Sequence, residues 1–235
     1  MTTIATWNCN MAFRTKKQRL LEYDPDILVI QECENPATTG DWDEFSDWRW
    51  IGDNDHKGLG IFCRNGLTIE STVDRASAAR YVLPVRIADS FNVLGIWAMN
   101  DETDRKQRYI GQVYTALQDY QDFLTSELIV AGDFNWNVIW DESPAAPLYG
   151  DFIETVDTLH SAGLISSYHR VTTTKYGNEA APTFFMHKNR DRSYHTDYLF
   201  MPASLVYAVD EFVVGSYEEW IDASDHMPIL VDLDA

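Results

Sequence analysis

Residues 128–135 read Leu-Ile-Val-Ala-Gly-Asp-Phe-Asn, and this stretch decides how the rest of the chain is interpreted. The apolar run Leu128–Ala131 predicts a short strand that is covered on both faces. Asp133 and Asn135 follow it, where a plain hydrophobic core would hold neither a carboxylate nor a carboxamide. For a single residue, a turn former or a cap is the commoner interpretation. A functional interpretation therefore requires the pattern to recur.

The pattern of an apolar run bordered by polar residues does recur along the chain. Short apolar runs bounded by Gly, Pro, Asp or Asn predict strands at 4–6, 27–31, 60–63, 82–87, 91–98, 128–131, 198–201 and 227–231. Besides Asp133 and Asn135, the polar residues at the ends of these strands are Asn8, Asn10, Glu32, Asp197, Asp225 and His226. Strand ends share one rim of a sheet, so we expect these groups to converge.

Clustered carboxylates favour a bound cation. Because like charges at close range repel one another, a hard divalent ion is their natural stabiliser. Magnesium fits best, since it takes oxygen ligands, keeps several waters and binds substrate phosphate in the same shell.

Three segments predict helices among these strands. Residues 13–21 end before a proline, 105–124 place apolar residues at helical spacing, and 151–162 end before Gly163. Residues 142–147 are expected to form a loop rather than a domain boundary. Helices among many short strands predict two packed sheets with helices outside, in a single domain over residues 1–235.

Composition bounds the class of protein. The 235 residues are 45% hydrophobic and 13% aromatic, which is enough for a substantial core and too much for a disordered chain. The N-terminus lacks the apolar segment of a secretory signal, and no apolar run approaches the roughly 18 residues that span a bilayer. We therefore expect a cytoplasmic protein. Three cysteines suggest no disulfide framework and are expected to be buried.

The charge bears on possible partners. The chain has 37 acidic residues against 18 Lys and Arg, for a formal net charge of -19. Such a surface repels a phosphate polymer unless a basic patch or bound cations offset it locally. Tight, non-specific binding to duplex nucleic acid is therefore not expected.

Five short motifs carry a resemblance to a known family. They are Trp7-Asn8-Cys9-Asn10, Gln31-Glu32, Gly132-Asp133-Phe134-Asn135, Thr196-Asp197-Tyr198 and Ser224-Asp225-His226-Met227-Pro228. Each is weak alone, but in this order they resemble the signatures of the endonuclease/exonuclease/phosphatase superfamily, which includes exonuclease III, abasic-site endonucleases and deoxyribonuclease-like phosphoesterases. The resemblance covers residues 7 to 228. It implies an α+β fold, a four-layered α/β sandwich of two mainly antiparallel or mixed sheets flanked by helices.

The resemblance also implies a role for each motif residue. Glu32 matches a metal ligand, with Asn10 and Asp225 near the same ion, which is Mg²⁺ with Mn²⁺ as a possible substitute. Asp133 and Asn135 match the pair that orients the attacking water and the phosphate. The implied reaction is in-line attack by water without a covalent enzyme intermediate.

The remaining motif residues match a support for the aspartate and a phosphate-contacting pair. Asn8 matches an amide that holds Asp133. His226 matches a histidine at the scissile phosphate, and Asp197 matches the carboxylate that binds it. Such a carboxylate fixes the histidine tautomer and favours the imidazolium. Whether Asp133 or His226 takes the proton from water is left open by the sequence.

Two positions depart from the family pattern. Asn10 stands where abasic endonucleases and exonuclease III have an aspartate, which is expected to weaken one metal contact. Trp97 aligns with a family tyrosine or histidine that touches the phosphate, although its indole donates one N–H and accepts none. A core aromatic is an equal alternative for Trp97. Asn100 matches a family asparagine that faces the site.

Three further residues are candidates for substrate contacts. Arg14 follows the first motif, although a solvated helix face is a simpler explanation. Trp136 follows Asn135 and has the shape to stack on a base, or to pack in the protein. His187 begins a polar, partly basic loop, 187–192, in a region that borders the substrate groove in the family.

These observations leave three classes of function. A Mg²⁺-dependent hydrolase of phosphodiester bonds, most simply a nuclease acting on DNA or RNA, fits the form of the motifs. A phosphatase or phosphodiesterase for a nucleotide, sugar phosphate or lipid headgroup fits the acidic surface. A catalytically silent binding module is the third, and the complete motif set argues against it. No membrane surface and no obligate protein partner are indicated.

Overall fold

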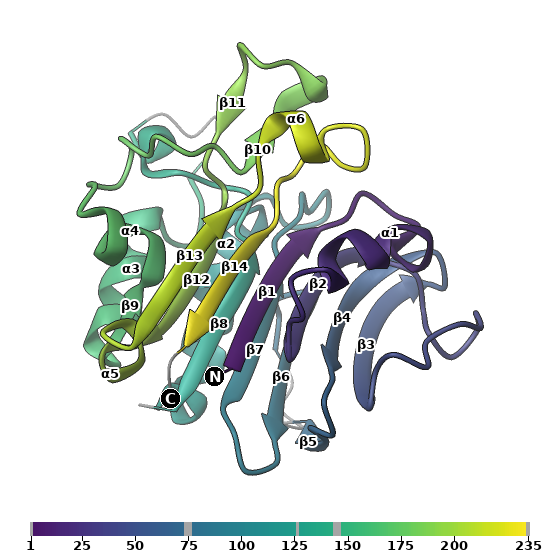
Figure 1. Cartoon of the computed structure of the whole chain (residues 1–235). Coiled ribbons are helices and arrows are strands. Elements are labelled where there is room, and N and C mark those ends of the chain that lie inside the picture. The colour runs from purple at the N-terminus through teal and green to yellow at the C-terminus, as the bar shows by residue number, and fades with distance from the viewer. Residues whose placement is uncertain (1, 73–76, 126, 143–146, 234–235) are drawn as a thin grey trace.

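Two six-stranded sheets form the centre of the computed structural model, which describes residues 2–72, 77–125, 127–142 and 147–233 (Figure 1). The first sheet has the order β13-β14-β1-β2-β4-β3 and consists of Val209–Val214, Ile229–Leu233, Thr2–Asn8, Ile27–Cys33, Lys57–Cys63 and Asp47–Asn54. The second has the order β5-β6-β7-β8-β12-β9 and consists of Ile69–Thr72, Val82–Ile87, Asn92–Trp97, Leu128–Asp133, Asp197–Pro202 and Leu164–Ser166. A separate ribbon pairs β10, Phe184–Phe185, with β11, Ser193–Tyr194.

Both sheets are mixed, and their topology sets where polar strand ends meet. β1 pairs with β2 in parallel, and β7 pairs with β8 in parallel, whereas the other pairings are antiparallel. Asn8 lies opposite Gln31 at the ends of β1 and β2. Asp197 lies opposite Asp133, so β12 begins where β8 ends. Each sheet therefore brings the motif residues to one rim.

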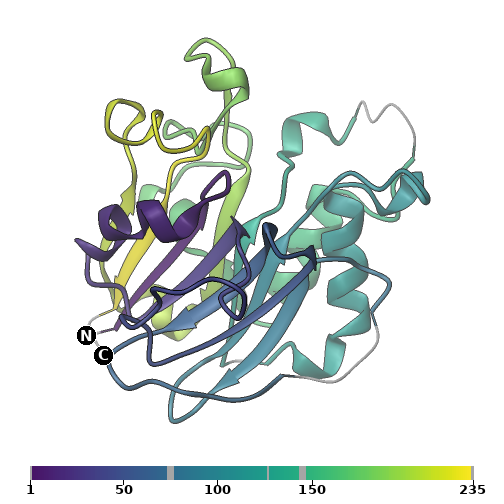
Figure 2. The same ribbon diagram turned by 90° about the vertical axis from the view of Figure 1, so that its right-hand side faces the viewer.

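The core lies in three layers of side chains. Between the sheets, apolar residues of both pack together, among them Ile4, Val29, Ile61, Val93, Ile129 and Leu199. Helices α2, Ile110–Asp119, and α3, Phe152–Ser161, cover the outer face of the second sheet. Helix α1, Phe13–Leu21, covers the first. Figure 2 shows α1 (purple) on one side and the teal helices on the other, which gives the four-layered α/β sandwich that the resemblance implied.

The helix predicted at 105–124 is broken. Short 3₁₀ turns at Arg105–Gln107 and Gln121–Phe123 flank α2. The break comes at Tyr109, which has φ 50° and donates its backbone N–H to the Met99 carbonyl at 2.8 Å. That bond ties the helix start to the loop after β7. Because the apolar spacing continues through the break, periodicity alone could not reveal it.

The other two predicted helices are confirmed to within a residue. α1 spans Phe13–Leu21, and α3 begins at Phe152. Asp151 caps α3, since its side chain accepts from the Glu154 N–H while the Glu154 side chain accepts from the Asp151 N–H. Three short helices were not predicted: α4, Ser167–Thr172, α5, Ala203–Val206, and α6, Tyr217–Trp220.

The predicted strands are all present, with ends that shift by up to three residues. Strands β3, β5, β9, β10, β11 and β13 were missed. The predicted loop at 142–147 falls mainly on residues 143–146, outside the described part of the chain. The three cysteines are buried and unpaired, as expected. Among the described residues, no helix has the length and apolarity needed to cross a membrane.

Candidate active site

Asp133, the last residue of β8, is the centre of the polar rim. Its side chain is fully buried. Asn8, at the end of β1, donates from Nδ2 to Asp133 Oδ2 at 3.1 Å, which joins one sheet to the other. A buried carboxylate is costly unless it is hydrogen-bonded, and Asn8 supplies part of that compensation.

Gly132 explains how Asp133 reaches this position. Its φ is +145°, and a Cβ there would collide with the Ile96 carbonyl of the neighbouring strand β7. Only glycine tolerates both the backbone conformation and this approach. The fold therefore requires a glycine at position 132 in order to place the Asp133 carboxylate at this point.

Asn135 turns back toward Asp133. It has φ 52°, in the left-handed region where asparagine is tolerated. Its backbone N–H donates to Asp133 Oδ1 at 2.8 Å, and its Nδ2 donates to the Ala98 carbonyl at 3.1 Å and approaches Asp133 Oδ2 at 3.4 Å. Asn135 thus holds the Asp133 carboxylate, and its side chain lies next to that carboxylate.

His226 and Asp197 form a buried pair beside Asp133. His226 Nδ1 lies 2.9 Å from Asp197 Oδ2, and its Nε2 lies 3.9 Å from Asp133 Oδ2. Thr183 donates its hydroxyl to Asp197 Oδ2 at 2.7 Å. The same hydroxyl accepts the N–H groups of Thr196 and Asp197, both at 3.0 Å. Asp197 therefore keeps a fixed orientation and points one ring nitrogen of His226 toward Asp133.

The backbone around His226 is held by β1 of the first sheet and by the β10–β11 ribbon. Trp7 Nε1 donates to the His226 carbonyl at 2.9 Å. Ser224 accepts the His226 N–H at 3.0 Å and donates to the Asn8 carbonyl at 2.7 Å. Phe184 of β10 forms a β-bridge with His226, and the two ring centroids are 4.5 Å apart. Side chains more than 200 residues apart in sequence thus fix one imidazole.

Burial and mutual charge shift the titration of this group. Burial raises the pKa of Asp133 to about 7, although the nearby His226 charge acts in the opposite direction. Burial alone would lower the pKa of His226, but the Asp197 and Asp133 carboxylates outweigh it and raise that pKa to about 10. The arrangement therefore favours an imidazolium next to a carboxyl group that exchanges its proton near neutral pH.

Glu32 lies on a bulge of β2. The pairing with β4 shifts between Gln31 and Cys33, so Glu32 is the extra residue, and it has φ 62°. Bulges of this kind re-aim a side chain at the edge of a sheet. Glu32 Oε1 accepts weakly from Asn8 Nδ2 at 3.5 Å, and its Oε2 lies 3.0 Å from Lys57 Nζ.

Asn10 and Asp225 lie on two neighbouring loops. Asn10 Nδ2 donates to Asp225 Oδ1 at 3.2 Å. The ammonium of Lys16 ties the loops together, because it donates to the carbonyls of Cys9, Asn10 and Ala223 at 2.8, 3.2 and 2.7 Å.

The residues that could hold a metal ion fall into two groups. One ligand atom from each of Asp133, Asp197 and His226 lies within 4.8 Å of the others, and the described residues contain no second such group of His, Cys, Asp or Glu. All three are buried, however, and Asp197 is already engaged by His226. Glu32, Asn10 and Asp225 are only partly buried. Oxygen ligands that water can also reach suit a hard ion that keeps part of its hydration shell better.

The predicted substrate-contacting residues differ in exposure and in their local contacts. Asn100 is exposed and lines a cavity of about 490 Å³ with Arg105 and Arg108. Trp136 is half-buried, donates to Asp141 at 2.8 Å and lies 6.2 Å, between ring centroids, from Tyr109.

The other two partly or fully accessible candidates are Arg14 and His187, whereas a third candidate, Trp97, is buried. Arg14 is half-buried, and its backbone N–H donates to Glu34 Oε1 at 3.0 Å, whereas His187 is exposed in the segment between β10 and β11. Trp97 is only 2% exposed and packs between the sheets. That burial argues against direct contact with a substrate and agrees with the alternative of a core aromatic.

Sequence reasoning missed three residues of the site. Thr183 anchors Asp197, Phe184 packs on the His226 ring, and Lys57 pairs with Glu32. A threonine followed by two aromatics, Thr183-Phe-Phe185, gives no distinctive signal. Lys57 follows a polar turn and looks like an ordinary surface cation. Only the folded arrangement identifies them.

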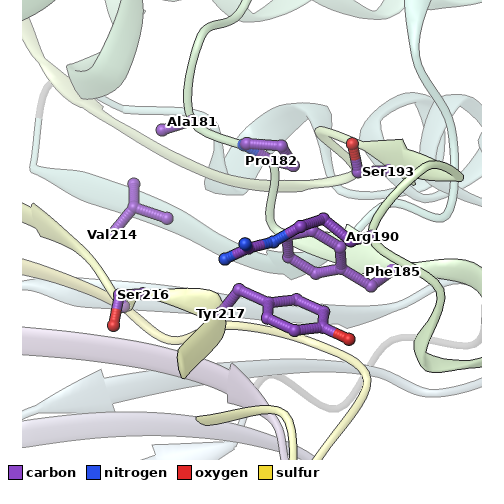
Figure 3. A pocket seen from close by; sticks show the side chains of 9 residues that line it. Ala181, Pro182, Phe185, Arg190, Ser193, Val214, Ser216 and Tyr217 are labelled. Atoms are coloured by element: carbon purple, nitrogen blue, oxygen red, sulfur yellow. The ribbon is translucent and has the colours of Figure 1, made fainter. Parts of the chain in front are cut away.

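A cavity of about 360 Å³ lies on the other side of β10 from His226. Phe184 and Phe185 point to opposite faces of the strand, as neighbouring strand residues do. Phe185 lines the cavity with Tyr217, and Figure 3 shows the Arg190 side chain extending between Pro182 and Tyr217. The cavity lining includes no residue of the group around Asp133. This cavity is therefore distinct from the candidate site around Asp133.

Comparisons with known proteins agree with the fold. The sequence model described as the Endonuclease/Exonuclease/phosphatase family matches residues 5–226. The 3′-5′ exonuclease NExo from Neisseria meningitidis is 20% identical, with a TM-score of 0.76 over 100% of both chains. An AP endonuclease from Archaeoglobus fulgidus is 16% identical, with a TM-score of 0.74 over 100% of both chains.

The 3′ phosphatase NExo from Neisseria, in a solved structure with a product DNA hairpin, is 19% identical, with a TM-score of 0.73 over 100% of both chains. Comparison with curated protein sequences gives no match. At these identities the structural likeness shows the fold, and the family assignment comes from the sequence match. Because that match spans nearly the whole chain, the protein belongs to the endonuclease/exonuclease/phosphatase family, whose members are phosphoesterase hydrolases.

Proposed function

We propose that this protein is a Mg²⁺-dependent nuclease that hydrolyses phosphodiester bonds in DNA, or in RNA, by in-line attack of water. The observation that carries the proposal is the arrangement around Asp133. Asn8 and Asn135 donate hydrogen bonds to the carboxylate, and His226, oriented by Asp197, lies 3.9 Å from it. A water and a phosphate bound next to this pair would meet a proton acceptor and a cation.

The charge of each side chain decides its role in the proposed reaction. Asp133 orients the water and takes its proton, because burial brings the pKa of its carboxyl to about 7, near the working pH. His226 stays protonated, with a pKa of about 10, and stabilises the charge that develops on the phosphate oxygens. Asn135 supplies an amide toward the same oxygens. Asn8, Asp197 and Thr183 act through the residues that they hold.

The half-exposed oxygens of Glu32, Asn10 and Asp225 would hold the divalent ion. Two carboxylates and one carboxamide match the hard oxygen ligands that Mg²⁺ prefers, and Mn²⁺ takes the same set. Enzymes of this family depend on divalent metals, and when bound the ion would supply Lewis-acid charge to the phosphate.

DNA is the favoured substrate because of the neighbours. An exonuclease, an AP endonuclease and a 3′ phosphatase bound to a DNA hairpin share the fold. Under this proposal, Asn100, Arg14, Trp136 and His187 would contact the nucleic-acid strand. Residues 1–235 would form one catalytic domain of a cytoplasmic enzyme that needs neither a membrane nor an obligate protein partner.

Asp133→Asn tests the centre of the mechanism. We expect kcat on plasmid and single-stranded DNA to fall by about 10³-fold or more, because the variant cannot accept a proton. The melting temperature should stay close to that of the wild type, since Asn keeps the shape. Asp157→Asn, at an exposed position of α3, removes the same charge and serves as the control. Full activity of Asp133→Asn would refute the mechanism.

A panel of substrates tests the substrate class and the metal dependence. Plasmid, single-stranded DNA, abasic duplex, RNA and small phosphoesters would be assayed with Mg²⁺ or Mn²⁺, and again with excess EDTA. We expect cleavage of DNA that EDTA abolishes and either metal restores. Activity that persists in excess chelator would exclude the metal-dependent scheme.

A phosphatase for a small phosphorylated molecule is the second candidate. The net charge of -19 favours it, because a small ligand needs only a local pocket whereas a polymer meets the whole field. In the same panel, phosphate release from nucleotides or sugar phosphates without action on any polymer would select this alternative.

A further inference from the structure

Lys57 places a permanent cation beside the predicted metal site. It is the first residue of β4, and its Nζ lies 3.0 Å from Glu32 Oε2. The same ammonium lies 5.2 Å from the ring centroid of Trp97. The side chains of Lys57 and Glu32 are 34% and 17% exposed, so the pair is partly shielded from water.

Fold stability is a weak explanation for this pair. A partly exposed Lys–Glu pair contributes roughly 0–1 kcal/mol. The cation could have paired with many other carboxylates in a chain of 37 acidic and 18 basic residues. It is held instead on a carboxylate that occupies a bulge with a positive φ, at the rim where Asn8 also reaches it.

Trp97 connects the ammonium to the pair of strands that carries Asp133. Trp97 lies opposite Asp133 in the register of β7 and β8. Lys57 therefore contacts Glu32 and also lies over the ring of a residue paired with Asp133, so a phosphate bound at Asp133 would be its alternative partner. A cation above an aromatic face is stabilised without a fixed hydrogen bond, so such a change of partner costs little.

We infer that Lys57 couples the binding of the divalent ion to the binding of the substrate phosphate. In the free enzyme the ammonium balances Glu32 and repels an incoming divalent ion. When a phosphate enters, the ammonium turns to it and releases Glu32 to the ion. This inference rests on the proposed function, because it takes Glu32 as a metal ligand.

The coupling has a thermodynamic consequence that needs no catalysis to observe. If phosphate strengthens metal binding, metal strengthens phosphate binding by the same factor. Removing the ammonium should strengthen metal binding to the free enzyme and abolish most of the coupling. Both effects are visible in binding constants alone.

The experiment measures Mn²⁺ binding by isothermal titration calorimetry, alone and with saturating deoxythymidine monophosphate, after correction for direct Mn²⁺–nucleotide binding. Lys57→Gln is compared with the wild type and with Lys175→Gln. Lys175 is exposed in the loop after α4, so its substitution changes the net charge equally. Lys57→Arg keeps the charge, and thermal melts of all variants check folding.

We expect Lys57→Gln to bind Mn²⁺ about three- to tenfold more tightly than the wild type in the absence of nucleotide. The nucleotide should tighten Mn²⁺ binding at least about threefold in the wild type, Lys175→Gln and Lys57→Arg, but less than about twofold in Lys57→Gln. Equal Mn²⁺ affinity of Lys57→Gln and Lys175→Gln, or no effect of nucleotide on the wild type, overturns the inference. Absence of nuclease activity in the wild type would instead refute the proposed function, so the two failures are distinct.

Discussion

Several single residues in or near the candidate site have an unusual backbone conformation. Asn10, Met11, Ala12, Glu32 and Asn135 all have positive φ, although none is glycine. Each such residue costs about 1–3 kcal/mol unless its surroundings hold it in place. Three of them follow one another directly after β1. Nine other described non-glycine residues also have positive φ, so this conformation is not confined to the site. Asparagine tolerates it, which leaves Glu32 as the predicted metal ligand where strain can be tested.

Glu32 allows a direct test of this strain. We compare Glu32→Gly with Glu32→Ala, because both remove the carboxylate and its contact with Lys57. Glycine accepts a φ of 62° without the steric cost that a Cβ brings. The glycine variant should therefore be about 1 kcal/mol more stable toward urea unfolding than the alanine variant.

Both variants should lose metal-dependent hydrolysis, because the ligand is gone. If the alanine variant is as stable as the glycine variant, the bulge is not strained. If either variant retains full activity, Glu32 is not a metal ligand.

At the scale of elements, Glu179 links α4 to the segment that carries Asp133. It accepts from His169 Nε2 at 3.0 Å, from the Gly177 N–H at 2.9 Å and from Asn137 Nδ2 at 3.2 Å. Burial alone would raise the pKa of Glu179, but the hydrogen bonds from His169 and Gly177 outweigh it and hold the pKa at about 2. A carboxyl whose pKa is lowered on folding stabilises the native state when it is ionised.

This pKa shift predicts how stability depends on pH. The contribution of Glu179 is complete above the ordinary value of 4.5 and is lost as pH falls toward about 2. In urea unfolding, the free energy of unfolding should therefore differ between the wild type and Glu179→Gln. This difference should be largest near pH 6 or so and should narrow between about pH 4.5 and pH 2. Glu70→Gln, at an exposed position, is the control. A difference that does not change with pH would contradict the assigned shift.

Sequence patterns predicted the central elements and missed the peripheral ones for physical reasons. Strands buried on both faces are continuous apolar runs, so β1, β2 and β8 were recognisable. β3, Asp-Trp-Arg-Trp-Ile-Gly-Asp-Asn, lies at an edge and is only half-buried, so it lacks such a run. The break at Tyr109 depends on a backbone bond to Met99, a partner ten residues away that helical spacing cannot register.

At the scale of the whole molecule, the site joins segments from both ends of the chain. The hydrogen bond from Trp7 to the His226 carbonyl spans 219 positions, and that from Asn8 to Asp133 spans 125. The ordered motifs indicated the main groups because each motif contains its own reactive side chain. They could not indicate Thr183 or Lys57, whose importance comes only from what they touch.

The global charge sets an expectation for salt dependence. A net charge of -19 repels a nucleic acid, and that repulsion is screened as ionic strength rises. At fixed Mg²⁺, KM for a single-stranded oligonucleotide should fall by about twofold or more between about 20 mM and about 300 mM KCl. Most proteins that neutralise phosphates show the reverse, because salt weakens counterion release.

A small phosphodiester whose leaving group is neutral should be assayed in the same KCl series. Comparison of its KM with that of the oligonucleotide separates long-range repulsion from local chemistry. The KM of the small phosphodiester should change less, because a ligand with one charge feels less of the field. If KM for the oligonucleotide rises with salt, local cations such as Arg14, Lys188 and Arg192 outweigh the global field. The rim would then act as a basic groove on an acidic protein, and the net charge would say nothing against a polymeric substrate.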